Sequence, residues 1–325
     1  MFWLTWRQHR KETLFVIAAL AVLAVLLIPS GRQMHSAFTG TGLADCLRGL
    51  DRSVLVPLNP DTGKTDCGPL LAQFNSRFGG RAPLGILFFF VPLLVGLFFG
   101  APLVSREIEH GTHRLVWTQG VSRLRWTAVK FGLVIAGAVV FAAAYTVLLT
   151  WWMTPLNMVG GSRLSLLVFD QQGIVPIAYT LFAVALGALA GTFTRRVLPT
   201  MAVTVAGFLV VRLLIAWRAR PQYLAPERRT YPYAVGESAP NDLLAGDWVL
   251  SQGFHDADGS LLQSGTVLCS GPADACTEFG AGAYNLELYQ PAERFWTFQY
   301  IEAGLFTALA VALLALAVHR IRRLA

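Results

Sequence analysis

SREIEHGTHRLVWTQGVSRLRWTAVK, residues Ser105 to Lys130, is the stretch that decides the fold. It is long, polar and crowded with charge, and it lies between two apolar runs that are each long enough to cross a bilayer. Its charged residues and histidines are Arg106, Glu107, Glu109, His110, His113, Arg114, Arg123, Arg125 and Lys130. We interpret the stretch as a cytoplasmic loop that carries a short helix, and we expect this helix to dock onto another protein.

The composition places most of the chain in lipid. Of the 325 residues, 54% are hydrophobic and only 14% are charged, whereas about 25% of the residues in a soluble domain are charged. Apolar runs of spanning length recur along the chain. The net charge of +7 would suggest nucleic acid in a soluble protein. Here the arginines cluster beside apolar runs, which is typical of orientation signals, so no nucleic-acid partner is predicted.

The predicted fold is an all-α polytopic membrane protein with six spans. The spans are expected at residues 14–28, 84–104, 128–150, 174–193, 198–217 and 298–318. Pro29 is expected to end the first span, and Pro92 to kink the second. Residues 1–30 would form an interfacial helix and the first span. A cleaved secretory signal peptide is the alternative for this region, but no clear small-residue cleavage site follows the apolar run.

The remaining predicted divisions follow from where the polar residues lie. Residues 31–83 are predicted to form an extracellular loop, and residues 84–217 hold spans two to five with the cytoplasmic loop at 105–127. Residues 218–297 form an extracellular domain with short strands. Residues 298–325 hold the sixth span and a basic tail. The N-terminus, the loop, the Arg195-Arg196 turn and the tail are all basic. Short basic segments stay in the cytoplasm. The chain is therefore predicted to be a multi-pass protein of the cell membrane with both termini on the cytoplasmic side.

The four cysteines support this orientation. Both long polar segments, which the arginines place outside, hold two cysteines each: Cys46 and Cys67, then Cys269 and Cys276. Disulfides persist outside the cytosol. Pairing within each segment is the economical arrangement, although four cysteines allow three connectivities. Free buried thiols are the alternative.

Few polar residues lie within the spans. The middles of the spans hold no Asp, Glu or His, which weighs against a transporter driven by a coupling ion. Arg212 and Glu302 lie near the outer ends of two neighbouring spans at similar depth, and we expect them to form an intramembrane ion pair. The alternative is that each side chain extends separately to the membrane surface.

No catalytic arrangement stands out, so the chain is not expected to be an enzyme by itself. The metalloprotease motif HExxH is missing. His110 and His113 are three residues apart, but polar surface residues are a better interpretation than a metal site, and no metal is predicted.

The second span carries two further patterns. It has an aromatic surface, which could contact lipid or line an apolar substrate path, and the candidates for such a path are Phe88, Phe89, Phe98 and Phe99. Glycines four residues apart, which let membrane helices approach closely, occur at Gly96 and Gly100 and again at Gly187 and Gly191. We interpret the glycines as helix packing.

The run REIEHGT from Arg106 to Thr112, followed by the VSR of 121–123 and by Lys130, resembles the loop after the second span of ABC-2 type transporter permeases. The order of elements is similar as well, with six spans, both ends cytoplasmic and an external segment between the last two spans. Residues 169–191 and 289–304 resemble an actinobacterial subgroup of these permeases.

This resemblance implies a function and a set of partners. The chain would be the membrane subunit of a type V ATP-binding cassette exporter that moves a hydrophobic or amphipathic substrate outward. It would pair with a second copy or a related permease, in contact with membrane lipid, and two copies of a separate ATPase would hold ATP and Mg. This chain has no phosphate-binding loop and would bind no cofactor.

The resemblance also assigns roles to residues. Residues 1–12 would form the interfacial helix, and a helix from about 106 to 114 would be the coupling helix. Its ATPase-coupling residues would be Arg106, Glu107, Glu109, His110, Gly111, Thr112 and Arg114. The two external segments are larger than the minimal family plan, so they leave the substrate open and could bind an extracellular partner. A non-transporting membrane sensor or scaffold is the alternative function.

Overall fold

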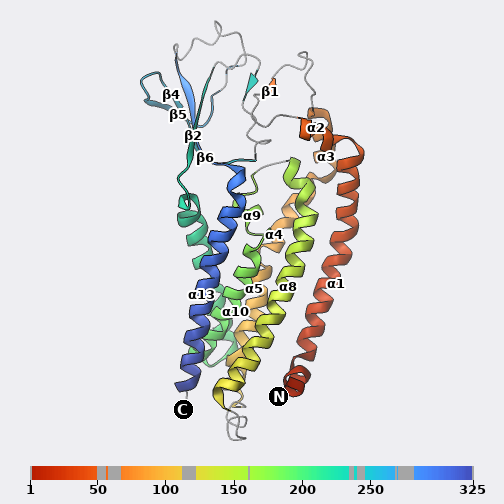
Figure 1. The fold of residues 1–325 in the computed structure, drawn as a ribbon, viewed down its shortest axis with the longest axis vertical. Coiled ribbons are helices and arrows are strands. Elements are labelled where there is room, and N and C mark those ends of the chain that lie inside the picture. The colour runs from red at the N-terminus through yellow and green to blue at the C-terminus, as the bar shows by residue number, and fades with distance from the viewer. Residues whose placement is uncertain are drawn as a thin grey trace.

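The computed structural model of the chain describes residues 2–49, 56–57, 67–111, 122–159, 162–233, 238–239, 246–267, 269 and 282–323. Within these residues, six helical stretches are long and apolar enough to cross a membrane: Ile17–Gly40, Gly85–Glu109, Leu124–Val159, Val175–Thr194, Val197–Gln222 and Ala292–Arg323. They form an elongated bundle, with both termini at one end and a small sheet at the other (Figure 1). The six predicted spans are therefore confirmed as helices.

The first span is longer than predicted. Helix α1 runs from Phe2 to Gly40, so the expected stop at Pro29 is wrong. Residues 2–12 belong to this same helix, and their predicted interfacial position stays a prediction. A proline inside a helix removes one backbone hydrogen bond, because it has no N–H. Packing against the neighbouring helix compensates here: a Cβ on Gly31 would lie 2.5 Å from the Trp151 ring, and the His35 ring stacks on the same indole at 5.0 Å.

The second span is interrupted, as Pro92 predicted. It follows the 3-10 turn η2 (Gly79–Leu84) and consists of α4 (Gly85–Phe88), α5 (Val91–Val95), the π-helical turn η3 (Gly96–Gly100) and α6 (Ala101–Glu109). Pro92 has no N–H to donate to the Phe88 carbonyl four residues earlier. The Tyr145 hydroxyl donates to that carbonyl instead, at 2.9 Å, and Arg212 Nη1 donates to the Phe89 carbonyl at 2.7 Å. Side chains from other spans thus satisfy the backbone at the break.

Glycines bring the second span against the fourth, α10 (Val175–Thr194). A Cβ on Gly100 would lie 2.7 Å from the backbone of Val184, and one on Gly187 would lie 2.6 Å from the backbone nitrogen of Ala101. A Cβ on Gly96 would lie 2.5 Å from Ala183, and one on Gly191 would lie 3.1 Å from the backbone nitrogen of Ser105. The helix packing predicted from the glycine spacing is confirmed. It makes α10 the buried centre of the bundle.

The other spans extend beyond their predicted ends. The third is α8 (Arg123–Val159), which the short α9 (Leu166–Phe169) connects to α10. The fifth consists of α11 (Val197–Leu214), the π-helical turn η4 (Ile215–Ala219) and the 3-10 turn η5 (Arg220–Gln222). The sixth is α13 (Phe295–Arg323), preceded by the 3-10 turn η7 (Ala292–Arg294). The fifth span was predicted to end at residue 217, but its helical turns continue to Gln222 and include Arg220.

A disulfide ties the first polar segment together. Helices α2 (Leu43–Gly49) and α3 (Gly68–Phe78) lie at the end of the bundle away from the termini (Figure 1). Cys46 and Cys67 are bonded to each other, as predicted. Cys269 is also disulfide-bonded. Cys276 lies outside the described residues, so its predicted pairing with Cys269 stays a prediction.

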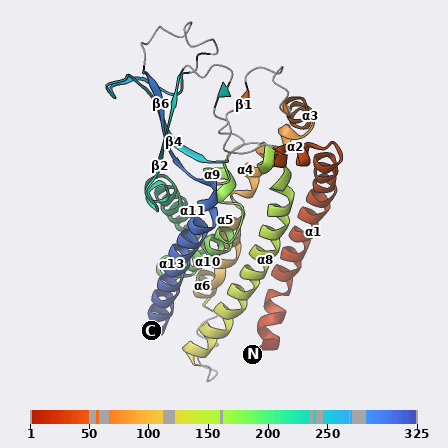
Figure 2. The same ribbon diagram turned by 45° about the horizontal axis from the view of Figure 1, so that its top comes forward.

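The second polar segment contains the predicted strands. Strands β2 (Glu227–Pro232), β6 (Tyr284–Gln290), β4 (Trp248–His255) and β5 (Leu261–Ser264) form an antiparallel sheet in that order. A two-residue ladder between β1 (Val56–Pro57) and β3 (Ser238–Ala239) joins the two polar segments. Sheet, α2 and α3 thus share one end of the bundle (Figure 2).

Candidate functional site

The polar end of the second span is the first candidate site. Arg106, Glu107 and Glu109 lie in the last turn of α6, and His110 follows as the C-cap. Gly111 follows this C-cap, and its φ of +68° favours glycine because L side chains clash there. Thr112, His113 and Arg114 lie outside the described residues. The predicted separate helix from 106 to 114 is therefore corrected in its first half: residues 106–109 continue the span.

Glu107 connects this end to the third span. Its carboxylate forms an ion pair with the Lys130 ammonium on α8. The two side chains are only 19% and 10% exposed, and the ammonium also lies 5.1 Å from the centre of the Trp126 ring. The partial burial of the pair strengthens it relative to an exposed surface pair.

Glu109 connects the same end to the fifth span. Its Oε2 accepts a hydrogen bond of 2.9 Å from the backbone N–H of Val197, the first residue of α11. The N-cap residue of that helix, Arg196, has no side-chain oxygen to accept from the free N–H groups. A carboxylate at a helix N-terminus is favoured by the hydrogen bond and by the helix dipole. Glu109 thus takes the place of the missing cap, across the tight Arg195 turn.

We call residues Arg106 to Gly111 the loop end. The contacts of Glu107 and Glu109 make it a junction between spans. Residues of the second span hold α8 through Glu107 and α11 through Glu109, while the glycine contacts hold α10. The second span therefore contacts the third, fourth and fifth spans near this end. The loop residues nearest to this junction, His110 and Gly111, are exposed and open to a partner.

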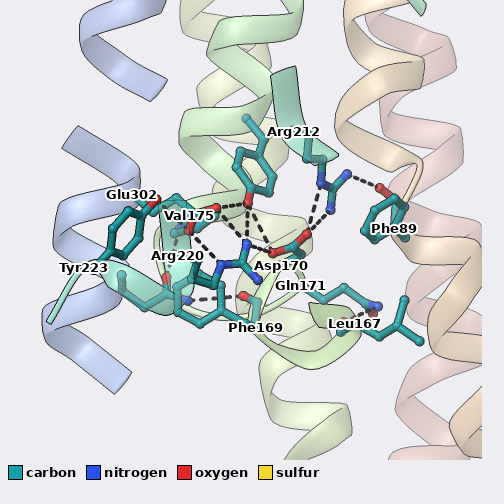
Figure 3. A network of polar contacts seen from close by, with 12 residues as sticks. Phe89, Leu167, Phe169, Asp170, Gln171, Val175, Arg212, Arg220, Tyr223 and Glu302 are labelled. Atoms are coloured by element: carbon teal, nitrogen blue, oxygen red, sulfur yellow. Dashed lines mark hydrogen bonds and ion pairs between the residues drawn. The ribbon is translucent and has the colours of Figure 1, made fainter. Parts of the chain in front are cut away.

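A buried ion-pair network is the second candidate site, near the opposite end of the bundle (Figure 3). Asp170 lies in its centre. Its Oδ2 is 3.1 Å from both Nε and Nη2 of Arg212, and its Oδ1 pairs with Arg220. Arg220 in turn binds Glu302 with two hydrogen bonds, of 2.8 and 2.7 Å. Each of the four residues is at most 1% exposed. Two arginines and two carboxylates balance each other, which is what allows such charges to be buried.

Two tyrosines complete the network. The Tyr179 hydroxyl lies between the carboxylates of Asp170 and Glu302 and accepts from Arg220 at 3.1 Å. The Tyr223 hydroxyl donates to Glu302 at 3.2 Å. Burial, and then the charge of Glu302, raises the pKa of Tyr223, so this hydroxyl remains protonated and can donate.

Gln299 fixes the start of α10 beside this network. Its Oε1 accepts from the backbone N–H groups of Ile174 and Val175 at 2.9 and 3.0 Å, and its Nε2 donates to the Phe169 carbonyl at 3.1 Å. Gly173 has φ +70°, and a Cβ there would lie 2.5 Å from Gln299 Oε1. The sixth span thereby caps the fourth.

The predicted pair of Arg212 and Glu302 is corrected in its details. Both side chains are buried, so the alternative of separate extension to the membrane surface is also wrong. They do not bind each other: Arg212 binds Asp170, and Glu302 binds Arg220. The two predicted residues belong to one network through two intermediates.

Sequence reasoning missed these intermediates because they lie outside the predicted spans. Asp170 is in the connection before α10, and Arg220 had been assigned to the external segment. The signal was available in principle, because a cation and an anion at one membrane depth each need a close partner. Tyr179 gave no signal, since a tyrosine in a span is ordinary.

The four phenylalanines of the proposed substrate path do not gather on one surface. Phe88 packs against Tyr145 and Trp152, and Phe89 is buried beneath the Arg212 guanidinium. Phe98 is 51% exposed, and Phe99 is partly buried in the core. Phe88 and Phe89 are therefore packing residues, and a role in a substrate path stays a prediction.

Among the described residues, no group of three or more His, Cys, Asp or Glu side chains is arranged to hold a metal ion. His110 binds the Arg106 carbonyl through Nδ1 at 2.8 Å. Its predicted neighbour, His113, lies outside the described residues.

Comparison with known proteins gives the family. Neither curated proteins nor solved structures yielded a match to the chain. A family model described as "ABC-2 membrane transporter related" matches residues 17–220, which include the first four spans, the fifth as far as Arg220, the loop end and three of the four network residues. Because this match covers more than half of the sequence, the chain, a multi-pass membrane protein, belongs to the ABC-2 membrane transporter related family.

Proposed function

We propose that this chain is the permease subunit of an ATP-binding cassette exporter. The observation that carries the proposal is the family match over residues 17–220, combined with a polar loop end that links several spans. The substrate would be hydrophobic or amphipathic and would move outward. The termini and the loop would face the cytoplasm, and the sheet would lie outside.

The partners follow from this role. A second copy of the chain or a related permease would complete the path, and two copies of an ATPase subunit would bind ATP and Mg²⁺. ATP hydrolysis would take place in those subunits, and this chain would carry the movement. The ATPase would contact the loop end at the exposed residues that follow Glu109.

The contacts of the loop end suggest how movement passes into the membrane. When ATP closes the ATPase pair, the two loop ends of the dimer approach each other. Glu107 would pull α8 through Lys130, and Glu109 would pull α11 through the Val197 N–H. The buried network would hold the opposite ends of the fourth, fifth and sixth spans together. ATP drives the change because it binds the closed state better than the open one.

The proposal is tested by purifying the chain from its native membrane in a gentle detergent and identifying the proteins that accompany it. A stoichiometric ATPase with a phosphate-binding loop is the expected result. A preparation without any ATPase, or with external proteins only, would overturn the proposal and favour the sensor or scaffold function.

Variants of the loop end locate the contact. Glu109→Arg should remove the ATPase or its stimulation, because it replaces the acceptor of the Val197 N–H with a like-charged group at the positive helix end. Glu109→Gln keeps an acceptor oxygen and should retain most of the activity. The matched control is Glu293→Arg, the same charge reversal at an exposed glutamate before the sixth span. Equal losses in Glu109→Arg and Glu293→Arg would contradict the assignment.

Gly111 gives an independent test of the same site. Among the described residues, no neighbour lies within 4 Å of a Cβ placed there, so the effect expected of a substitution is on the backbone. Gly111→Pro should abolish transport, while Gly111→Asn should be tolerated because asparagine adopts positive φ more easily than other side chains. Both variants should still insert into the membrane. Transport at the normal rate with Gly111→Pro would show that the helix end has no coupling role.

A further inference from the structure

The first span leaves a groove open along its contact with the third. The groove has a volume of about 550 Å³, and its walls come from α1 and α8. It is lined by Ile28, Arg32, Ala143, Ala144, Val147, Leu148 and Trp151. The groove exists because the side chains of Ala143 and Ala144 are small, while larger apolar side chains form its borders. Helices α1 and α8 lie side by side at the edge of the bundle (Figures 1 and 2).

One end of this groove is cationic. Arg32 follows Ile28 by one helical turn toward the sheet, and Trp151 occupies the same end on α8. Arg32 is exposed, and it forms no ion pair with any residue in the described part of the chain. A guanidinium at the end of an apolar stretch, beside a tryptophan, lies where the hydrocarbon of a bilayer meets the headgroups. An anionic headgroup at this depth would therefore find a cation that has no ion-pair partner among the described residues.

We propose that this groove binds an anionic phospholipid of the leaflet on the sheet side. One acyl chain lies along Ala143 and Ala144, and the headgroup phosphate accepts hydrogen bonds from the Arg32 guanidinium. A phosphate suits this donor because guanidinium presents parallel N–H groups to two oxygens. The site fixes lipid between the edge span α1 and the rest of the bundle. The inference rests on the membrane location alone and not on the proposed transport function.

A second groove in the same molecule provides the contrast. It has a volume of about 740 Å³ and is lined by Ile174, Tyr300, Ala303, Gly304, Thr307, Ala308, Val311 and Ala312. None of these residues is charged, so this groove on α13 should hold lipid chains without preference for the headgroup. The comparison separates specific binding at α1 from general contact with lipid.

Native mass spectrometry of the full chain tests the proposal. The protein would be equilibrated with equal amounts of phosphatidylglycerol and phosphatidylcholine in mild detergent, and the lipids that remain bound would be counted. Arg32→Gln should lower the retention of phosphatidylglycerol about fivefold, the effect of one basic residue near an anionic headgroup. It should lower the retention of phosphatidylcholine less, because the choline ammonium of that lipid neutralises its phosphate. The matched control is Arg218→Gln, which removes an exposed arginine near the sheet-side end of the fifth span. Equal loss in the two variants would overturn the proposal.

Substitutions that fill each groove with a larger side chain provide a second test of the proposal. Ala144 is exposed to the membrane, so Ala144→Leu should fold and should reduce bound phosphatidylglycerol, whereas Ala308→Leu in the uncharged groove should not change the preference between the two lipids. If Ala144→Leu lowered the fraction of dimer and left lipid retention unchanged, the groove would be a contact between two copies and the proposal would be wrong. The thermal midpoint of each variant verifies that the fold is intact.

Discussion

The two polar sites of the bundle differ in how firmly they hold the helices. At the loop end, one ion pair and one backbone hydrogen bond join the second span to α8 and α11, and the next residues are exposed. At the opposite end, Asp170, Arg212, Arg220 and Glu302 are at most 1% exposed and bind in an unbroken series. Buried charges must remain paired, whereas partly exposed ones can exchange a partner for water. We infer that the network holds the spans together and that the loop end can move.

The largest expected effect comes from the centre of the network. Asp170→Asn should lower the free energy of unfolding by roughly 3–5 kcal/mol, because it leaves two buried arginines short of negative charge. The control is Asp258→Asn in an exposed hairpin, which should change stability by less than about 0.5 kcal/mol. The midpoints of thermal unfolding in one detergent give the comparison. Similar midpoints for the two variants would mean that the network does not stabilise the bundle.

Double-mutant cycles should rank the individual pairs. Arg220→Met combined with Glu302→Met should show a coupling energy of about 2–3 kcal/mol, because these side chains share two hydrogen bonds in a buried site. The loop-end cycle, Glu107→Met with Lys130→Met, should give about 1 kcal/mol or less. Coupling between Arg212 and Glu302, which act only through neighbours, should fall below that of Arg220 and Glu302. The reverse order would restore the direct pair predicted from the sequence.

A smaller effect is expected at the break in the second span. Tyr145→Phe removes the hydroxyl that donates to the Phe88 carbonyl, and it should cost roughly 0.6–1 kcal/mol. Tyr300→Phe is the control, since that tyrosine is 64% exposed. Unfolding measurements on both variants decide the matter. If the two substitutions had the same small effect, another group or water would satisfy the carbonyl.

The smallest expected effect concerns the stability of the β2-β6-β4-β5 sheet at acid pH. Burial alone would raise the pKa of Glu287, but hydrogen bonds from Arg229, Tyr231 and Gln252 outweigh it and hold the pKa below the ordinary value. This carboxylate therefore stabilises the sheet above its unfolded pKa of about 4.3, and the contribution is lost as the pH falls through the lower folded value. Glu287→Gln should flatten the dependence of stability on pH below about 4.3. An unchanged acid midpoint in this variant would show that other groups control acid unfolding.

The sequence was informative where one local pattern decides the structure. Apolar runs located all six spans, Pro92 located the break, and the glycine spacing located the closest helix contact. Helix ends were harder, because tertiary contacts carry α1 past Pro29 and extend α6 into the predicted coupling helix. Sequence patterns describe local preference, and packing between distant segments overrides it at such ends.

The candidate sites show the same division. Glu107 and Glu109 were selected by resemblance, but their partners Lys130 and Val197 follow only from the fold. Arg212 and Glu302 were selected because charge in a span is costly. Asp170 was not selected, since a connection between helices is expected to be solvated, and only the folded bundle buries it among two arginines.

Site-specific photocrosslinking in the native membrane tests the central claim most directly. A photoreactive amino acid would replace His110 at the exposed loop end or, as the comparison, Asp258 in the exposed hairpin of the sheet. The account predicts a crosslink from position 110 to an ATPase subunit and none from position 258. A crosslink to the ATPase from position 258, or from neither position while the ATPase copurifies, would contradict the assignment of the loop end as the coupling site.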